Sequence, residues 1–179
     1  MLLVRDAGGA VPVRDGLSFR ELSAADARRY AGEIGTDSPS TFLRRLSAWT
    51  HCFVVDDGST LLHASWVTTA RAWTSEIRGY ISPPVGDAYV YESFTRSETR
   101  GRGIYPFALS GICAVMGQQR VARVWVGVES DNTPSLKAIT KAGFQEAFEV
   151  SFHRSFGRVR LQEPTGRLAE QGRTMIARA

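Results

Sequence analysis

The sequence lacks most of the features that mark membrane, secreted or metal-binding proteins. No apolar run comes near the roughly 18 residues that a membrane-spanning helix needs. An arginine and an aspartate interrupt the first residues, where a signal peptide requires an unbroken apolar stretch. Its two cysteines, Cys52 and Cys113, lie far apart in apolar surroundings without metal-ligand spacing, so we expect buried reduced thiols. These absences favour a cytoplasmic protein that uses no metal and binds no membrane.

Lysine is almost absent as well. Lys137 and Lys141 are the only two, and the other basic residues are arginines. The net charge of +4 suits an anionic small ligand as well as a nucleic acid, so it does not decide between them. The three histidines, His51, His63 and His153, are scattered, and each is read first as a structural residue.

What is present is the pattern of an ordinary globular domain. With 179 residues and 43% hydrophobic residues, the chain is long enough for one domain with a buried core. Periodicity and end signals predict the elements in chain order. The first half contains a strand at 17–22, helices at about 24–34 and from 38, two strands joined by the turn at 57–58, and a loose stretch at 71–87. The second half contains a strand at 87–95, a helix at 104–119, a strand at 122–129, a helix from 133 and one or two closing strands.

This order of elements predicts a domain of the α/β class, with one mixed sheet and helices on both faces. We place the domain at residues 17–161. Residues 1–16 are expected to form an arm or an extra strand, and residues 162–179 a polar tail, ordered or frayed.

The most informative stretch is TRSETRGRGIYPFAL at residues 95–109, where a strand runs through Arg-Gly-Arg-Gly into a helix. A helix start leaves backbone N–H groups without partners and carries partial positive charge, and glycine lets the backbone close around an anion. Such a loop predicts phosphate binding. Two alternatives stay open: a plain surface turn, or a nucleic-acid tract, which would normally repeat in a disordered region.

Two segments together resemble a known family. TRSETRGRGIY at 95–105 is similar to the acyl-coenzyme A signature R/Q-x-x-G-x-G/A of the GCN5-related N-acetyltransferases, the GNAT superfamily. NTPSLKAITKAGF at 132–144 is similar to the second family segment, which starts with Asn and closes with Gly-Phe. The resemblance is specific over roughly 88–148. It implies a central, mostly antiparallel sheet of six or seven strands with about four helices, and an enzyme that transfers an acyl group, normally acetyl from acetyl-CoA, to an amine.

The resemblance also implies roles for individual residues. Backbone groups of the loop would hold the pyrophosphate of the cofactor, and Ser93, Phe94 and Thr95 would pair with its pantetheine arm. Asn132 would hydrogen-bond near that arm, although it is also a candidate helix cap. The complete set of expected cofactor-binding residues is Ser93, Phe94, Thr95, Arg100, Gly101, Arg102, Gly103, Ile104, Tyr105, Asn132 and Ser135.

The sequence departs from the family pattern at two positions. Tyr105 stands where the loop signature ends in a small residue, so its side chain is expected to narrow or reshape the phosphate site. Ile139 stands where the family often has a tyrosine that protonates the leaving thiolate. The usual general acid is therefore missing, and Tyr105, Ser135 and Thr140 are its weaker replacements.

For the base that accepts the proton of the amine, the sequence offers Glu92. In a regular strand Val90, Glu92 and Phe94 share one face, and a carboxylate between apolar neighbours is uncommon unless it is paired or functional. The alternative is a structural Glu92 paired with an arginine across the sheet. Tyr91 on the opposite face is a second catalytic candidate, as a substrate contact or as an acid.

The expected partner is a small-molecule amine, with residues 36–50 and 71–87 lining its pocket. No nucleic acid is expected as a partner, and a homodimer is compatible with the sequence. Two rival functions remain: transfer of longer acyl chains from coenzyme A or a carrier protein, and a non-catalytic acyl-CoA-binding module.

Overall fold

The computed structural model describes residues 1–75, 77–155 and 158–178. Within these ranges a seven-stranded sheet forms the centre of the molecule, in the order β2-β3-β4-β7-β8-β1-β9. Its strands are β2 (Ser18–Glu21), β3 (Thr50–Asp56), β4 (Leu61–Thr68), β7 (Ala88–Thr95), β8 (Arg123–Gly127), β1 (Leu2–Asp6) and β9 (Gln145–Phe148). Only β7 and β8 are parallel, and the other neighbours are antiparallel. The predicted mixed, mostly antiparallel sheet is confirmed.

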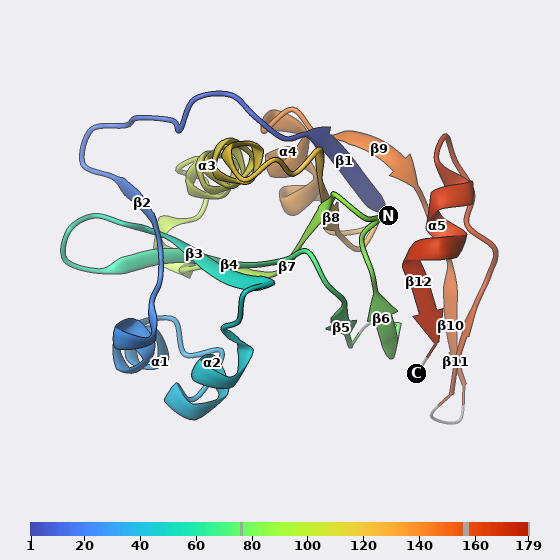
Figure 1. Cartoon of the computed structure of the whole chain (residues 1–179), viewed down its shortest axis with the longest axis horizontal. Coiled ribbons are helices and arrows are strands. Elements are labelled where there is room, and N and C mark those ends of the chain that lie inside the picture. The colour runs from blue at the N-terminus through green and yellow to red at the C-terminus, as the bar shows by residue number, and fades with distance from the viewer. Residues whose placement is uncertain (76, 156–157, 179) are drawn as a thin grey trace.

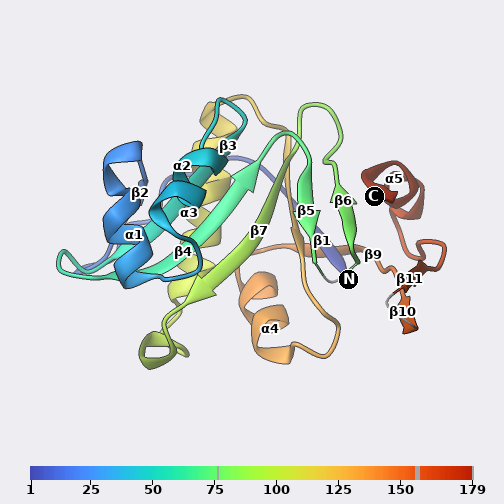
Figure 2. The same ribbon diagram turned by 90° about the horizontal axis from the view of Figure 1, so that it is seen from below.

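Helices cover both faces of this sheet, as predicted (Figures 1 and 2). The helices α1 (Ala27–Glu33) and α2 (Pro39–Arg45) lie on one face, and α3 (Ile104–Gln118) and α4 (Thr133–Lys141) lie on the other. A core that includes Tyr30, Phe42 and Trp66 fills the first interface. A second core, with Leu109, Ile112 and Met116, fills the interface under α3. The two cores hold β4 and β7 rigidly between the helix layers.

The N-terminal segment is part of the sheet rather than a loose arm. Strand β1 lies between β8 and β9 and is antiparallel to both, and Leu2, Leu3 and Val4 are buried. The chain then crosses the end of α3, where the N–H of Gly8 donates to the carbonyl of Cys113 over 2.8 Å. A strand of apolar residues in the middle of a sheet is covered on both faces, which explains the continuous run LLV.

The polar stretch at 162–179, whose order the sequence leaves open, contains regular structure. Within that stretch α5 (Ala169–Met175) is followed by β12 (Ile176–Arg178), which pairs with β6 (Gly79–Ile81) and through it with β5 (Ala72–Thr74) in a second sheet. The side chain of Met175 is fully buried, and its burial offsets the entropy of ordering a segment that is otherwise polar. The loose stretch at 71–87 therefore contains two short strands that this helix supports.

The expected closing strands separate from one another. β9 joins the central sheet, whereas β10 (Phe152–Ser155) and β11 (Arg158–Leu161) form a hairpin of their own. Across the ranges that the structure describes, no helix is long and apolar enough to cross a bilayer.

Substitution of Gly117 tests the docking of the N-terminal segment onto α3. A Cβ atom at Gly117 would lie 2.6 Å from the Cα of Gly8, so Gly117→Ala must displace backbone. We expect a loss of about 1–3 kcal/mol in the free energy of unfolding, measured with urea. Gly32→Ala is the matched control, because no atom lies within 4 Å of its new methyl group on helix α1. It should gain roughly 0.5–1 kcal/mol from helix propensity. Equal stability of the two variants would show that the segment does not dock there.

Candidate active site

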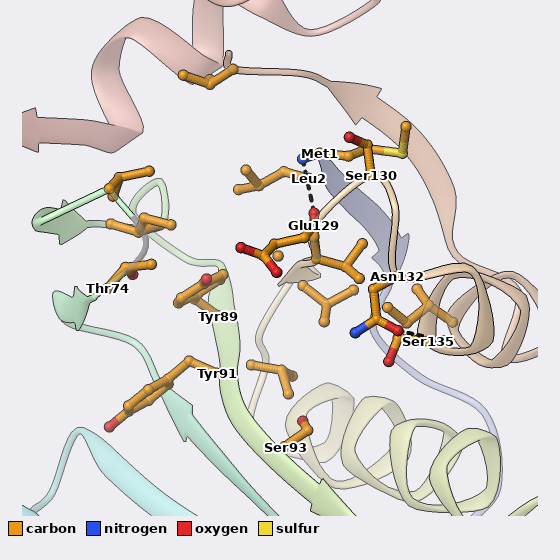
Figure 3. A pocket seen from close by; sticks show the side chains of 18 of the residues that line it. Met1, Leu2, Thr74, Tyr89, Tyr91, Ser93, Glu129, Ser130, Asn132 and Ser135 are labelled. Carbon is orange, nitrogen blue, oxygen red and sulfur yellow. Dashed lines mark hydrogen bonds between the residues drawn. The ribbon is translucent and has the colours of Figure 1, made fainter. Parts of the chain in front are cut away.

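The candidate site is a cavity at the point where the two parallel strands, β7 and β8, separate. The two strands pair only over residues 88–90 of β7, which lie opposite Val124–Val126 of β8. β7 itself continues to Thr95. A cavity of about 710 Å³ lies at this opening. Figure 3 shows Tyr89, Tyr91 and Ser93 along β7, with Glu129, Asn132 and Ser135 across the cavity from them. Beyond Val90, β8 gives the backbone of β7 no partner, so this edge can pair with an extended ligand.

Strand β7 is irregular at Glu92. Tyr91 lies opposite Trp66 and Phe94 opposite Ala64, so two residues, Glu92 and Ser93, oppose the single Ser65. Glu92 has a φ of 47°, in the left-handed region that costs a side-chain-bearing residue about 1–2 kcal/mol. This is a β-bulge, a feature that re-aims side chains and is frequent beside active sites. The prediction that Val90, Glu92 and Phe94 share one face is wrong, because the bulge interrupts the alternation of the strand.

Arg45 of helix α2 holds Glu92 in place. Its Nη1 lies 2.5 Å from Oε2 of Glu92 and 2.6 Å from Oδ2 of Asp37. Its guanidinium also lies 4.0 Å from the ring centroid of Trp66, where cation–π attraction adds to the ion pairs. The side chain of Glu92 is 52% exposed, so the apolar surroundings expected for it are absent. Glu92 is paired with an arginine, but that arginine comes from helix α2 and not from across the sheet, as the structural alternative had it. Glu92 still lines the cavity.

Tyr91, the second catalytic candidate, also lines the cavity. Burial raises the pKa of the Tyr91 phenol, and the adjacent Arg45 guanidinium opposes that rise. The phenol therefore keeps its proton near neutral pH. Its ring stacks on Tyr89, with centroids 6.1 Å apart, so the two tyrosines form one aromatic wall of the cavity.

Several backbone N–H groups of the Arg-Gly loop, where it leads into α3, have no hydrogen-bond partner in the described part of the chain. After the short helix η2 (Ser97–Thr99), Gly101 and Gly103 have φ angles of 75° and 73°, which favour glycine. The N–H groups of Arg100 and Arg102 make long bonds of 3.3 and 3.4 Å within this turn. In the described part of the chain no hydrogen-bond partner is found for the N–H groups that remain, those of Gly101, Gly103, Ile104 and Tyr105.

Arg14 is a basic residue near the loop that the sequence analysis missed. Its Nη1 donates to the carbonyl of Arg102 over 2.7 Å, although 88 residues separate the two. Arg100 lies close by, with its Nε bonded to the carbonyl of Thr95 over 3.2 Å. The loop thus combines its own Arg100 and Arg102, and the neighbouring Arg14, with unpaired amides, which is the composition of a polyphosphate site. No local signal in the sequence connects Arg14 or Arg45 to the site, because both arrive through tertiary contacts.

The predicted cofactor-binding residues divide into two groups. Ser93, Tyr105, Asn132 and Ser135 line the cavity, as do the catalytic candidates Tyr91 and Glu92. The remaining ones are outside its lining, and they are Phe94, Thr95, Arg100, Gly101, Arg102, Gly103 and Ile104. Phe94 packs against the core under α1 and α2, and Ile104 is buried, so neither side chain is available to a ligand. The loop remains a candidate through its backbone amides and through the side chains of Arg100 and Arg102.

Asn132 caps a helix, which was the alternative to its predicted role as a cofactor contact. Its Oδ1 accepts from the N–H of Ser135 over 3.2 Å, so Asn132 caps α4. Asn132 still lines the cavity, because a cap uses only its carbonyl oxygen. Of the two stretches expected to line an acceptor pocket, 71–87 contributes Trp73, Thr74, Ser75, Ile77 and Ile81 to the lining, whereas 36–50 contributes nothing directly.

The structure shows what surrounds Ile139 and Tyr105, the two residues that depart from the family pattern. Ile139 is fully buried at the floor of the cavity and offers no proton. Tyr105 points inward and stacks on His63, with ring centroids 5.2 Å apart, so it does not block the amides of the loop.

The thiols of Cys52 and Cys113 are both buried, and burial raises the pKa of Cys113 to about 11. Neither cysteine is suited to act as a nucleophile. No group of three acidic, His or Cys side chains in the described ranges is close enough to hold a metal ion.

Comparisons with known proteins agree on the fold. No family model and no curated protein sequence matches the chain. Among solved structures, an aminoglycoside acetyltransferase from an uncultured soil metagenomic sample, in complex with sisomicin, is 12% identical and superposes with a TM-score of 0.59 over 79% of this chain and 97% of that one. A ribosomal-protein-S5-alanine acetyltransferase from Vibrio fischeri is 16% identical, with a TM-score of 0.60 over 79% of this chain and 87% of that one.

A further solved structure contains a ligand built from both substrates. The aminoglycoside acetyltransferase AAC(6')-Iy, in complex with a bisubstrate analogue of CoA and acetylneamine, is 16% identical and matches with a TM-score of 0.59 over 78% of this chain and 97% of that one. At these identities the likeness concerns the fold alone. The chain has the fold of the GCN5-related N-acetyltransferases.

Proposed function

We propose that this protein is an acyl-CoA-dependent N-acyltransferase that moves an acetyl group from acetyl-CoA to a primary amine of a small molecule. The proposal rests above all on the parting of β7 and β8 beside an Arg-Gly loop whose amides lack partners. One end of this site suits a polyphosphate, and the other end is a cavity large enough for a second substrate. Solved structures of the same fold that are acetyltransferases support the assignment.

The loop supplies the binding site for the donor. The free amides of Gly101, Gly103, Ile104 and Tyr105 point from the head of a 15-residue helix, where the macrodipole favours negative charge. Arg14 bonds the carbonyl of Arg102, and Arg100 bonds that of Thr95, so both lie at the loop and can add charge-assisted bonds to phosphate. The open edge of β7 then leads an extended arm from the loop toward the cavity.

The acceptor end has the opposite charge. Four carboxylates line the cavity, and they belong to Glu92, Glu129, Asp131 and Glu149. None of its described lining residues is a lysine or an arginine, although the whole chain carries a net charge of +4. This separation of charge along one cleft favours a cationic amine as acceptor and steers it away from the donor's phosphates. Trp73 and the stacked Tyr89 and Tyr91 add aromatic walls that suit a cation or a ring.

Acyl transfer by direct attack needs few groups from the protein. Free alkyl ammonium ions have a pKa of roughly 10.4, so the acceptor must lose a proton before its nitrogen can bond to the thioester carbon. Glu92 is the proposed acceptor of that proton, directly or through water; its ion pair with Arg45 and its position on the bulge beside the cavity support this role. As the C–N bond forms, the C–S bond breaks and its electron pair leaves with the thiolate, whose conjugate acid has a pKa of roughly 8.5.

Substitution of Gly103 tests donor binding at the loop. Gly103→Ala places a side chain at a φ of 73°, and the backbone must rotate to relieve a strain of roughly 1–2 kcal/mol. We expect the affinity for coenzyme A, measured by isothermal titration calorimetry, to fall about tenfold as the amides lose their aim. Gly58→Ala is the control, since Gly58 has a φ of 89° in a hairpin turn away from the site. Unchanged affinity in Gly103→Ala would remove the loop from the donor site.

Glu92→Gln tests the base. The amide keeps the shape of the side chain but accepts a proton far less readily, and Arg45 remains paired with Asp37. We expect kcat for thiol release from acetyl-CoA, with amines present, to fall about a hundredfold while coenzyme A affinity is kept.

Glu98→Gln, in the loop before α3, is the control and should leave the rate unchanged. Equal turnover of parent and Glu92→Gln would exclude Glu92 as the base. A parent that binds acetyl-CoA but transfers acetyl to none of a broad panel of amines would instead support the non-catalytic alternative, and a preference for longer chains would support the other rival.

A further inference from the structure

A chain of hydrogen-bonded polar side chains leads from the interior of the sheet to the cavity. His63 of strand β4 is fully buried, with Nδ1 2.7 Å from Oγ1 of Thr95 and Nε2 2.8 Å from Oγ of Ser65. The Oγ of Ser65, which is also fully buried, lies 2.7 Å from that of Ser93. Ser93 is exposed and lines the cavity, where Figure 3 shows it on β7. The proposed chemistry makes no use of His63 or Ser65.

The hydrogens of this chain can be counted. Both ring nitrogens of His63 have hydroxyl partners, and burial lowers its pKa to about 3, so the ring is neutral and carries one N–H. Each of the three hydroxyls also carries one hydrogen. The four groups thus hold four hydrogens, and the three contacts between them use three. One hydrogen is left for a group outside the chain, and it lies at one of the two ends.

The tautomer of His63 decides which end carries the spare hydrogen. With the ring hydrogen on Nδ1, the ring donates to Thr95, Ser65 donates to Nε2 and Ser93 donates to Ser65. The spare hydrogen is then that of Thr95. With the ring hydrogen on Nε2 every bond runs the other way, because Thr95 donates to the ring, the ring to Ser65 and Ser65 to Ser93. The spare hydrogen is then that of Ser93.

The surroundings of the two ends favour the hydrogen on Nε2. Thr95 is only partly exposed and lies outside the cavity lining, and within the described ranges no acceptor other than His63 is found for its hydroxyl. Ser93 opens onto the cavity, where water or a ligand can accept its hydrogen. A spare hydrogen at Ser93 therefore avoids the cost of a donor without an acceptor.

We propose that the Ser93 hydroxyl donates a hydrogen bond to an amide carbonyl oxygen of the acyl donor's extended arm, and that His63 and Ser65 are positioning residues that keep its hydrogen available. Ser93 lies on β7 between Glu92, the proposed base, and the end of the strand that leads into the Arg-Gly loop, so an arm that runs from the loop to the cavity passes it. A carbonyl oxygen only accepts, so it needs the arrangement in which the protein does not use the hydrogen of Ser93 itself. The identity of the ligand rests on the proposed function, whereas the order of hydrogens does not.

Binding of coenzyme A tests this contact without any acyl transfer, because coenzyme A contains the arm but no acyl group. Ser93→Ala removes the hydroxyl, and we expect the affinity measured by calorimetry to fall about three- to tenfold. Ser65→Ala removes the group that donates to Ser93 and strengthens it as a donor, so a smaller loss of about two- to threefold is expected. Thr68→Val is the control, because it removes a buried hydroxyl of the same strand that bonds Thr50 instead. Its affinity should equal that of the parent.

The double variant Ser65→Ala/Ser93→Ala should bind coenzyme A no more weakly than Ser93→Ala alone. If the loss caused by Ser65→Ala persists there, Ser65 acts on binding by a route other than Ser93, and its positioning role is overturned. If Ser93→Ala binds as tightly as Thr68→Val, the hydroxyl does not contact the arm. A loss seen with acetyl-CoA but absent with coenzyme A would place the contact at the thioester and overturn the assignment to the arm.

The ring of His63 reports the order of hydrogens in the absence of any ligand. Its ¹⁵N shifts, assigned with His63→Gln, should show a neutral ring with the hydrogen on Nε2 that does not titrate between about pH 5 and 8. In Ser65→Ala this N–H loses its acceptor, so the hydrogen should move to Nδ1 and be accepted by Thr95. A parent ring with its hydrogen on Nδ1 would leave Ser93 no hydrogen for a ligand and would overturn the proposal.

Failure of the proposed function gives a different result. If the parent protein binds neither coenzyme A nor acetyl-CoA, the proposed function fails, and the proposed ligand of Ser93 is overturned with it. The tautomer of His63 still decides the order of hydrogens in that case.

Discussion

The site depends on the early end of the parallel pairing between β7 and β8. Two parallel strands in the centre of a sheet normally stay paired along their length, because an unpaired buried backbone group is costly. Here the pairing stops at Val90 and Val126, and the bulge at Glu92 turns the next residues of β7 away. The opening exposes backbone donors and acceptors in the middle of a rigid sheet. An extended ligand can replace the missing strand there without disturbing either core.

Charge is distributed along this opening in a way that serves two substrates. Arginines gather where α3 begins, and carboxylates gather in the cavity beyond β8. Arg45 is the exception, since it lies at the acidic end but is neutralised by Asp37 and Glu92. A guanidinium with two carboxylate partners leaves the neighbourhood acidic while fixing the geometry of Glu92. The ion pair between Arg45 and Glu92 therefore explains how an exposed glutamate on a strained bulge keeps one orientation.

Much of this molecule could be predicted from its sequence, and the errors have a common cause. The Arg-Gly loop, the helix that follows it and the strand at 88–95 were predictable because their signals are local: periodicity, glycine and a cap. The bulge was not, since Val90, Glu92 and Phe94 alternate as in any regular strand, and only the pairing of Tyr91 with Trp66 and of Phe94 with Ala64 reveals it. Arg14, Arg45 and the buried Met175 were missed for the same reason, because each acts on residues far away in sequence.

The replacement of a small residue by Tyr105 then has a physical explanation. A bulky residue at the head of α3 would obstruct the loop if it pointed outward, but its ring lies against His63, and His63 is surrounded by hydroxyls. A fully buried imidazole needs two such partners, so His63, Ser65 and Thr95 require one another. Ser93 hydrogen-bonds Ser65 and lines the cavity, so the cluster reaches it. Buried polar groups are costly unless they are paired, and here hydrogen bonds pair His63 with Thr95 and Ser65, while ring stacking on His63 keeps Tyr105 away from the loop.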